Sequence, residues 1–174
     1  VGALYVSDLV ECLRTEKEAA TKKEVATAIG RFGPLSRPAV LAHTGAIKDP
    51  DAGAKAAVVD ALGRIGPDAK AAASELLPLV KDPDNGVKKA AIFALGRIDP
   101  DDPAPVSAAL CGVLKAETDK DLRVEAVTSL GLLGDRSPEV AEAIAQILAE
   151  KDVDLRKGAV RSLGKLGRAA KPHA

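Results

Sequence analysis

The fold is decided by a segment at residues 82–100, which reads DPDNGVKKAAIFALGRIDP. Its ending, ALGRI at residues 94–98, returns in related form four more times along the chain. The first glycines of successive copies are separated by 33, 33, 35 and 33 residues, and they are Gly30, Gly63, Gly96, Gly131 and Gly164. Repetition at a fixed period is the signature of an architecture in which each repeat is one supersecondary unit.

Positions counted back from this first glycine keep a constant character. Nine, five, four and one residues before it the side chains are apolar, as in Val87, Ala91, Ile92 and Leu95, with Thr21 as the exception. This spacing marks one face of an amphipathic helix. The residue eight before is always basic: Lys22, Lys55, Lys88, Arg123 and Arg156. The residues fourteen and twelve before are always acidic: Glu16, Asp49, Asp82, Glu117 and Glu150, then Glu18, Asp51, Asp84, Asp119 and Asp152.

Each repeat therefore predicts two helices joined by a turn. The second helix begins after an acidic N-cap such as Asp51, Asp84 or Asp152. It ends at the second glycine of the motif, which can adopt the left-handed conformation, and Asp99 replaces that glycine once because Asp tolerates this conformation. The first helices are predicted at about residues 2–13, 36–47, 69–80, 104–115 and 138–149.

An acidic residue followed six positions later by a basic one, which an apolar residue precedes, resembles the HEAT repeat. Asp82 with Lys88 and Glu150 with Arg156 fit this pattern. The short period and the Leu-Gly-x-hydrophobic-Gly ending are similar to the bacterial phycobilisome-lyase-like subgroup. The resemblance covers essentially the whole chain and departs most in the first repeat, at Thr21. It implies that the acidic and basic columns form ladders between repeats, and that the second helices line a concave binding surface.

The expected fold is all-α, a right-handed α-α superhelix of about five HEAT-like helix-turn-helix repeats in one domain over residues 1–174. The repeats are expected at 1–33, 34–66, 67–100, 101–134 and 135–167, and residues 168–174 begin a further, truncated repeat. The chain begins at Val1 rather than Met, so we expect a monomer or part of a longer multidomain chain.

Three columns on the second helices belong neither to the apolar face nor to the charged ladders. They lie seven and three residues before the first glycine and one residue after it, and they hold eight basic residues but a single acid. The resemblance places them on the concave face, and their variation from repeat to repeat is typical of recognition positions. The predicted contacts are Lys23, Thr27, Arg31, Asp60, Arg64, Lys89, Phe93, Arg97, Thr128, Lys157, Arg161 and Lys165. The columns also contain Ala56, Val124 and Leu132.

Phe93 is the one aromatic residue in this set, near the middle of the array. We hypothesise that Phe93, Lys89 and Arg97 form the centre of a groove for an acidic, partly apolar peptide or protein, because aromatic residues and Arg are favoured as interface anchors. The alternative, left open, is that Phe93 packs onto the neighbouring repeat.

Several chemistries lack the residues that they require. The histidines, His43 and His173, are not followed by Glu, whereas the HEAT-like di-iron hydroxylases depend on repeated His-Glu pairs. Cys12 and Cys111 are predicted on first helices three repeats apart, too far for a disulfide. No catalytic residue, metal site or cofactor is predicted, and no apolar run of 18 residues predicts membrane insertion.

The sequence favours a non-catalytic scaffold that binds a partner protein or peptide on its concave face. Lys plus Arg equals Asp plus Glu at 25 each, so no global positive field favours nucleic acid. Two alternatives remain: contact with a nucleic-acid backbone through the basic concave face, and a lyase-type chaperone that assists cofactor attachment to a protein.

Overall fold

The structure, a computed structural model, describes residues 2–39 and 45–167. Within these ranges the regular elements are α- and 3-10 helices, with no strand. The predicted truncated repeat at 168–174 and the middle of the predicted helix 36–47 lie outside the described residues.

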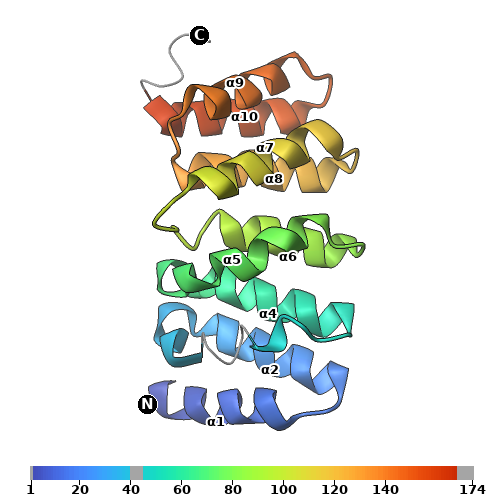
Figure 1. Ribbon diagram of the computed structural model, residues 1–174, viewed down its shortest axis with the longest axis vertical. Coiled ribbons are helices and arrows are strands. Elements are labelled where there is room, and N and C mark those ends of the chain that lie inside the picture. Colours follow the sequence, from blue (N-terminus) through green and yellow to red (C-terminus); the bar gives the residue numbers. More distant parts are fainter. Residues whose placement is uncertain (1, 40–44, 168–174) are drawn as a thin grey trace. The chain divides into compact units, whose positions relative to one another are not determined.

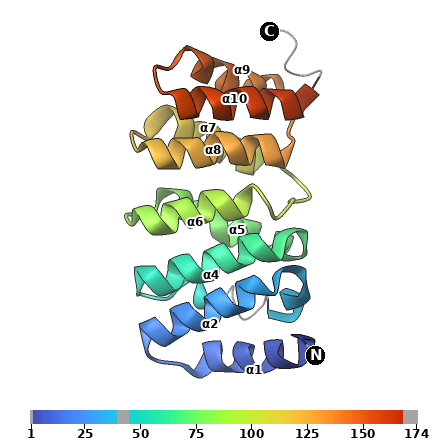
Figure 2. The ribbon, with the colours of Figure 1, turned by 180° about the vertical axis from the view of Figure 1, so that it is seen from behind.

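The chain divides into two compact units, Val1–Pro100 and Asp101–Ala174. The helices of the first unit are α1 (Gly2–Thr15), α2 (Ala19–Arg31), η1 (Gly33–Ala39), α4 (Ala52–Ile65), η2 (Gly66–Ala72), α5 (Ala73–Leu76), η3 (Leu77–Lys81) and α6 (Asn85–Leu95). Those of the second are α7 (Ala104–Ala116), α8 (Lys120–Leu133), α9 (Pro138–Gln146), η4 (Ile147–Ala149) and α10 (Val153–Leu166). In Figure 1 the second unit shows α7 and α9 in front of α8 and α10. Figure 2, seen from behind, shows the second helices of each unit side by side: α2, α4 and α6 in one, α8 and α10 in the other.

The predicted acidic caps are confirmed at four of the second helices, whereas the Glu18 side chain at the start of α2 makes no capping hydrogen bond. The Asp51 carboxylate accepts a hydrogen bond from the Ala54 N–H at 2.7 Å, and the Asp84 carboxylate accepts one from the Val87 N–H at 3.0 Å. Asp119 and Asp152 cap α8 and α10 in the same way. Each cap satisfies an amide that the first turn of a helix leaves without a partner.

The predicted helix ends are confirmed in part. Helices α4, α8 and α10 end one residue before the second glycine, whereas α6 ends at Leu95, beside the first glycine, so its predicted end at Asp99 is wrong. The second glycine of the motif has positive φ wherever it occurs: Gly33 (53°), Gly66 (77°), Gly134 (71°) and Gly167 (64°). Asp99 takes the same place with φ 48°, the one non-glycine residue with positive φ among those described. The positive φ recurs, but ψ differs between 14° at Gly134 and −141° at Gly66, so only some of these residues are in the left-handed helical region.

The first helices are confirmed in part. Helix α1, helix α7 and the run α9–η4 cover the predicted ranges 2–13, 104–115 and 138–149. The prediction of a continuous helix at 69–80 is wrong, because residues 66–81 form two 3-10 segments around the four-residue α5. Pro78 lies inside that range; it has no N–H to donate and its ring obstructs the preceding turn. The predicted helix at 36–47 likewise begins as the 3-10 segment η1.

The predicted apolar face forms the core, except in the last repeat, where Val160 is 61% exposed. In the third repeat Val87, Ala91, Ile92, Leu95 and Ile98 are fully buried. No tryptophan or methionine is available, so aliphatic side chains fill this core. The amphipathic pattern thus identified the buried side of α6 correctly.

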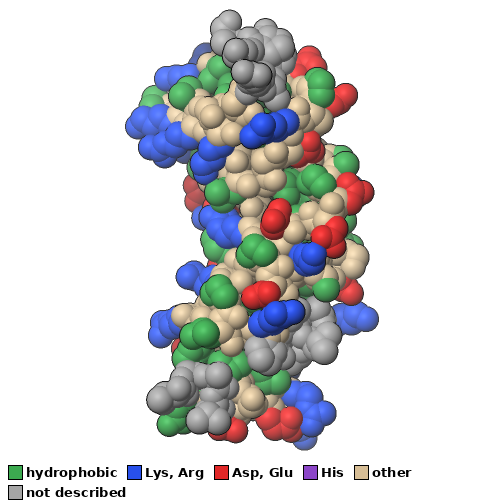
Figure 3. Space-filling model, turned by 90° about the vertical axis from the view of Figure 1, so that its left-hand side faces the viewer, with side chains coloured by type: hydrophobic (Ala, Val, Ile, Leu, Met, Phe, Trp, Pro, Cys, Tyr) green, Lys and Arg blue, Asp and Glu red, His purple; other side chains and the backbone are tan. Residues whose placement is uncertain are grey.

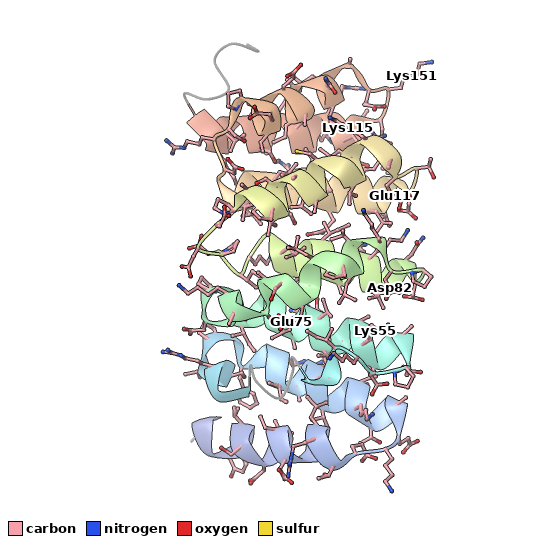
Figure 4. All side chains as sticks on the ribbon, in the orientation of Figure 1. Lys55, Glu75, Asp82, Lys115, Glu117 and Lys151 are labelled. Atoms are coloured by element: carbon pink, nitrogen blue, oxygen red, sulfur yellow. The ribbon has the colours of Figure 1, made fainter. Side chains whose placement is uncertain are left out.

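The charged columns pair between successive repeats, as the HEAT resemblance implies. Lys22 pairs with Asp49, and the Lys55 Nζ lies 3.1 Å from the Asp82 Oδ2. Lys55 and Asp82 are labelled near one edge of their unit in Figure 4. In the second unit the Arg123 Nη2 lies 2.7 Å from the Glu150 Oε1. These columns therefore serve the scaffold.

The first glycine of the motif allows neighbouring second helices to approach closely. A Cβ added at Gly63 would stand 2.8 Å from the Ala94 Cα, and one added at Gly131 would stand 2.8 Å from the Ser162 Cα. This packing role of the first glycine has a signal in the sequence. Two residues before each first glycine stands a small residue: Ala28, Ala61, Ala94, Ser129 or Ser162. Small residues on both helices let the backbones meet.

Candidate binding surface on the second helices

The three predicted contact columns form one row along each second helix. Their members are four residues apart, so they lie on one side of the helix. The rows are Lys23-Thr27-Arg31 on α2, Ala56-Asp60-Arg64 on α4, Lys89-Phe93 on α6 with Arg97 in the turn after it, Val124-Thr128-Leu132 on α8 and Lys157-Arg161-Lys165 on α10. None of these side chains is fully buried.

In the first unit, α4 and α6 hold their arginines by contacts within the protein. The Arg64 Nε donates to the Asp60 Oδ2 at 2.6 Å. The Arg97 guanidinium lies 3.7 Å from the centre of the Phe93 ring, and its Nη1 donates to the Phe93 carbonyl at 3.0 Å. Arg64 also reaches the ring, at 5.9 Å from its centre. These two guanidinium groups are therefore already occupied.

Phe93 is half-buried and contacts the preceding repeat. Its ring lies so close to Gly63 that a Cβ added there would stand 2.7 Å from two ring carbons. The structure thus brings Phe93 together with Arg97 and Arg64, while Lys89 is exposed one turn earlier. The alternative interpretation, that Phe93 packs onto the neighbouring repeat, therefore holds for one side of the ring. Use of the Phe93 cluster by a ligand stays a prediction.

The row on α2 is more open. Lys23 and Arg31 are exposed, and the Thr27 hydroxyl donates to the Lys23 carbonyl at 2.7 Å. That bond to the preceding turn occupies the hydroxyl proton of Thr27.

In the second unit, α8 and α10 enclose a hollow of about 520 Å³. Its lining comprises Val124 and Thr128 of α8 together with Asp154, Lys157, Gly158, Arg161, Ser162 and Lys165 of α10. The structure thus brings together Thr128 and the predicted contacts Lys157, Arg161 and Lys165. Val124 occupies a contact column but is absent from the predicted set because it is apolar. We name this hollow the α8–α10 groove.

The floor of the α8–α10 groove is built from small residues. A Cβ added at Gly158 would stand 2.7 Å from the Val127 Cγ1, so only glycine lets α10 approach α8 there. The buried Ser162 hydroxyl donates to the Val127 carbonyl at 2.7 Å. With the Gly131–Ser162 contact, these interactions hold the two helices close, and the long side chains of α10 form a wall above them.

The α8–α10 groove is positively charged. Within the described residues, Lys157, Arg161 and Lys165 make no hydrogen bond or ion pair. The acid in the lining, Asp154, is bound by Lys120 at 2.7 Å, and Asp152 is bound by the same ammonium at 3.0 Å. The hydrogen bonds from Lys120 to these two carboxylates raise the pKa of Lys120 to about 12. Figure 3 shows Lys and Arg side chains gathered at the upper left, at the level of α8 and α10.

Among residues 2–39 and 45–167, no three His, Cys, Asp or Glu side chains are grouped as metal ligands. Cys12 and Cys111 are free, and burial raises the pKa of the Cys111 thiol. None of the described helices has both the length and the apolar character needed to cross a bilayer.

Comparisons with solved structures identify the same type of fold. An engineered protein of the Northeast Structural Genomics Consortium is 22% identical at a TM-score of 0.72, over 92% of this chain and 78% of that one. A designed armadillo repeat protein in complex with the peptide (KR)4 is 17% identical at a TM-score of 0.74, over 93% and 82%. The complex of CpcE and CpcF of phycocyanin lyase from Nostoc sp. PCC7120 contains a chain 19% identical at a TM-score of 0.67, over 90% and 96%.

The comparisons by sequence find fewer matches than the comparisons by structure. No curated protein matches the chain. A family description, HEAT repeats, matches residues 6–96, 43–110 and 107–173. Together these matches extend over nearly the whole sequence. The chain belongs to the HEAT-repeat family.

Proposed function

We propose that this protein is a non-catalytic scaffold that binds an acidic segment of a partner protein in the α8–α10 groove. The observation that carries the proposal is the set of three cations along α10, which have no acceptor among the described residues and border a hollow of about 520 Å³. Burying such cations against carboxylates yields charge-assisted hydrogen bonds, which are stronger than neutral ones.

Two features make a structural role for these cations insufficient as an explanation. Lys165 lies in the last turn of α10, where a cation favours the negative helix end, but Lys157 and Arg161 lie outside that turn. Like charges four residues apart also repel each other, so this row costs stability rather than adding to it. A ligand with negative charge would remove that repulsion.

The proposal is tested by the affinity of a fluorescein-labelled peptide of six glutamates, measured by anisotropy at 50 and 150 mM NaCl. We expect binding by the natural protein and at least a tenfold loss in the double variant Lys157→Gln, Arg161→Gln. The matched control is Lys115→Gln, an exposed lysine on α7 in the other helix layer of the same unit (Figure 4). A peptide that does not bind, or that binds the double variant equally well, contradicts the proposal.

A nucleic-acid backbone is the second candidate, because three cations without acceptors could also contact phosphates. Proteins that hold single strands usually add aromatic platforms for the bases, and the lining of the α8–α10 groove has none. A single-stranded oligothymidylate that displaces the glutamate peptide at equal concentration would favour this candidate. The likeness to the CpcE–CpcF complex concerns the fold; co-purification with a coloured tetrapyrrole would favour a lyase-type role.

A further inference from the structure

The cations of the α8–α10 groove are spaced like alternate residues of an extended chain. Lys157, Arg161 and Lys165 are four residues apart on α10. Successive members are therefore separated by about 6 Å along the helix axis. In an extended strand, side chains two residues apart point to the same side and are separated by about 6.6 Å. A strand parallel to α10 can therefore place one carboxylate near each cation.

The opposite wall of the groove has a different character. The row on α8 is Val124, Thr128 and Leu132, with no charge. Val124 and Thr128 line the groove and are half-buried, and Leu132, one turn further along α8, is 42% exposed. The Thr128 hydroxyl donates to the Val124 carbonyl at 2.8 Å, which leaves its methyl group available for contact. One wall is thus basic and the other is largely apolar.

The length of the groove suits a short extended segment. The lining on α10 extends from Asp154 to Lys165, a length of about 16 Å at the helical rise. Five residues of an extended strand cover about the same length.

From these three observations we infer that the α8–α10 groove binds an extended peptide in which acidic and apolar residues alternate. The peptide lies along the helix axes. Its acidic side chains face Lys157, Arg161 and Lys165, and the intervening apolar ones face Val124, Thr128 and Leu132. The inference rests on the proposed function and specifies its ligand, because the two sides of a strand match the two walls of the groove.

The position of the peptide along the groove is limited by Asp154. This carboxylate lies one turn before Lys157, at the start of α10, and is turned toward Lys120. A ligand carboxylate placed beyond Lys157 would meet its negative charge, so three alternate acids fill the site. Arg161 faces the central acid and is the residue on which the contact depends most.

The experiment compares two labelled peptides of identical composition, each flanked by Gly-Ser. One has the core Glu-Val-Glu-Val-Glu, and the other has the core Glu-Glu-Glu-Val-Val. We expect the alternating peptide to bind at least fivefold more tightly. The variant Leu132→Lys, which adds charge to the apolar wall, should weaken the alternating peptide at least threefold more than the permuted one. Lys115→Gln again serves as the control for a general change of charge.

Each outcome has one meaning. A fivefold preference that Arg161→Gln reduces to less than twofold supports the inference. Equal binding of the two peptides, with both weakened by Arg161→Gln, overturns the alternating register and leaves the proposed function standing. If neither these peptides nor the glutamate peptide binds while the far-ultraviolet circular dichroism is that of a folded helical protein, the proposed function itself is overturned.

Discussion

The second helices of the two units follow the same repeat pattern, but the residues on their exposed sides differ. In the first unit Arg64 is paired with Asp60, and Arg97 is stacked on Phe93. In the second unit Lys165 follows Arg161, and neither has an acceptor among the described residues. Each of these terminal cations has the same place in its repeat. The residue four positions earlier, on the same side of the helix, decides whether the cation is held or left available.

This difference separates structural charge from charge available for binding. An acid or an aromatic ring at the earlier position satisfies the cation within its own helix. A second cation there repels it and keeps the surface open, at a small cost in stability. In the first unit, contacts within the protein therefore occupy two of the arginines, whereas in the second unit the cations of the α8–α10 groove make no such contacts. The predictions below test which properties the units share and where they diverge.

The largest effect should be common to both units, because the core is the part that they share. Leu95 and Leu130 hold the same place in their repeats and are both fully buried. Leu95→Asp and Leu130→Asp should each cost more than about 4 kcal/mol, since each would bury a charge without a partner. Urea denaturation followed by circular dichroism measures this. A normally folded variant in either unit would show that its helix faces are assigned wrongly.

The next effect should differ in sign between two glycines of the same motif. At Gly63 a Cβ would meet the Ala94 Cα at 2.8 Å, whereas at Gly164 nothing lies within 4 Å. Gly63→Ala should destabilise the protein by about 1–3 kcal/mol through overpacking. Gly164→Ala should stabilise it by about 0.5 kcal/mol, because alanine is the better helix former. Thermal melts of both variants decide the matter, and equal shifts would contradict the close approach.

A third effect is the pH dependence of the stability that the charge ladders contribute. The Asp82 side chain is 9% exposed, against 38% for Glu150. Burial opposes ionisation of Asp82, but the Asp84 N–H and the Lys55 ammonium outweigh it and hold the pKa of Asp82 below its usual value. A lowered folded-state pKa means that this stabilisation is complete above the unfolded pKa, about 3.9, and is lost as the pH falls through the folded pKa.

Asp82→Asn should therefore cost about 1 kcal/mol at pH 7, and Glu150→Gln should cost less, because the more exposed pair is more screened. Below about pH 4 the gap between natural protein and Asp82→Asn should narrow, since the natural carboxyl becomes protonated as well. Urea denaturation at pH values from 7 to 3 measures the free energies of unfolding of both variants and their dependence on pH. If the difference in free energy of unfolding between the natural protein and Asp82→Asn widened as the pH fell, the predicted direction of the pH dependence would be wrong.

The smallest effects distinguish the two surfaces directly. Arg97→Gln removes the contact with the Phe93 ring and should cost about 0.5–1 kcal/mol. Arg161→Gln removes a like charge between Lys157 and Lys165 and should stabilise the protein by about 0.2–0.5 kcal/mol. Differential scanning calorimetry of the pair resolves this contrast. A clear loss of stability from Arg161→Gln would mean that Arg161 has a structural role.

Much of the fold follows from the sequence because it depends on local, repeated features. Asp84 caps α6, Asp99 adopts a positive φ in the turn that follows, and Lys55 reaches Asp82 of the next repeat. Each feature has a short-range cause that a five-fold repeat makes visible. The helix predicted at 69–80 was wrong because the periodic pattern was given more weight than Pro78, which breaks an α-helix wherever it stands beyond the first turn.

The candidate site could be predicted only in part. The sequence identified the exposed columns and placed their centre at Phe93, which stays a prediction; it did not single out the three neighbouring cations of α10. The spacing of Asp60 and Arg64 already indicates a pair within one helix, so that part of the difference was present in the sequence. The groove itself was not. It depends on how closely Gly158 and Ser162 bring two backbones together, which no single helix reveals.

The contact between successive second helices has a consequence for how such a chain can evolve. Gly30 meets Ala61, Gly63 meets Ala94 and Gly131 meets Ser162, so small residues face each other at these three contacts, with the Phe93 ring beside Gly63 as the one large aromatic neighbour. A duplicated or recombined copy of about one repeat would find an acceptable neighbour on either side. The gene can therefore lengthen by whole units while each new copy acquires its own surface residues, and with them a different specificity.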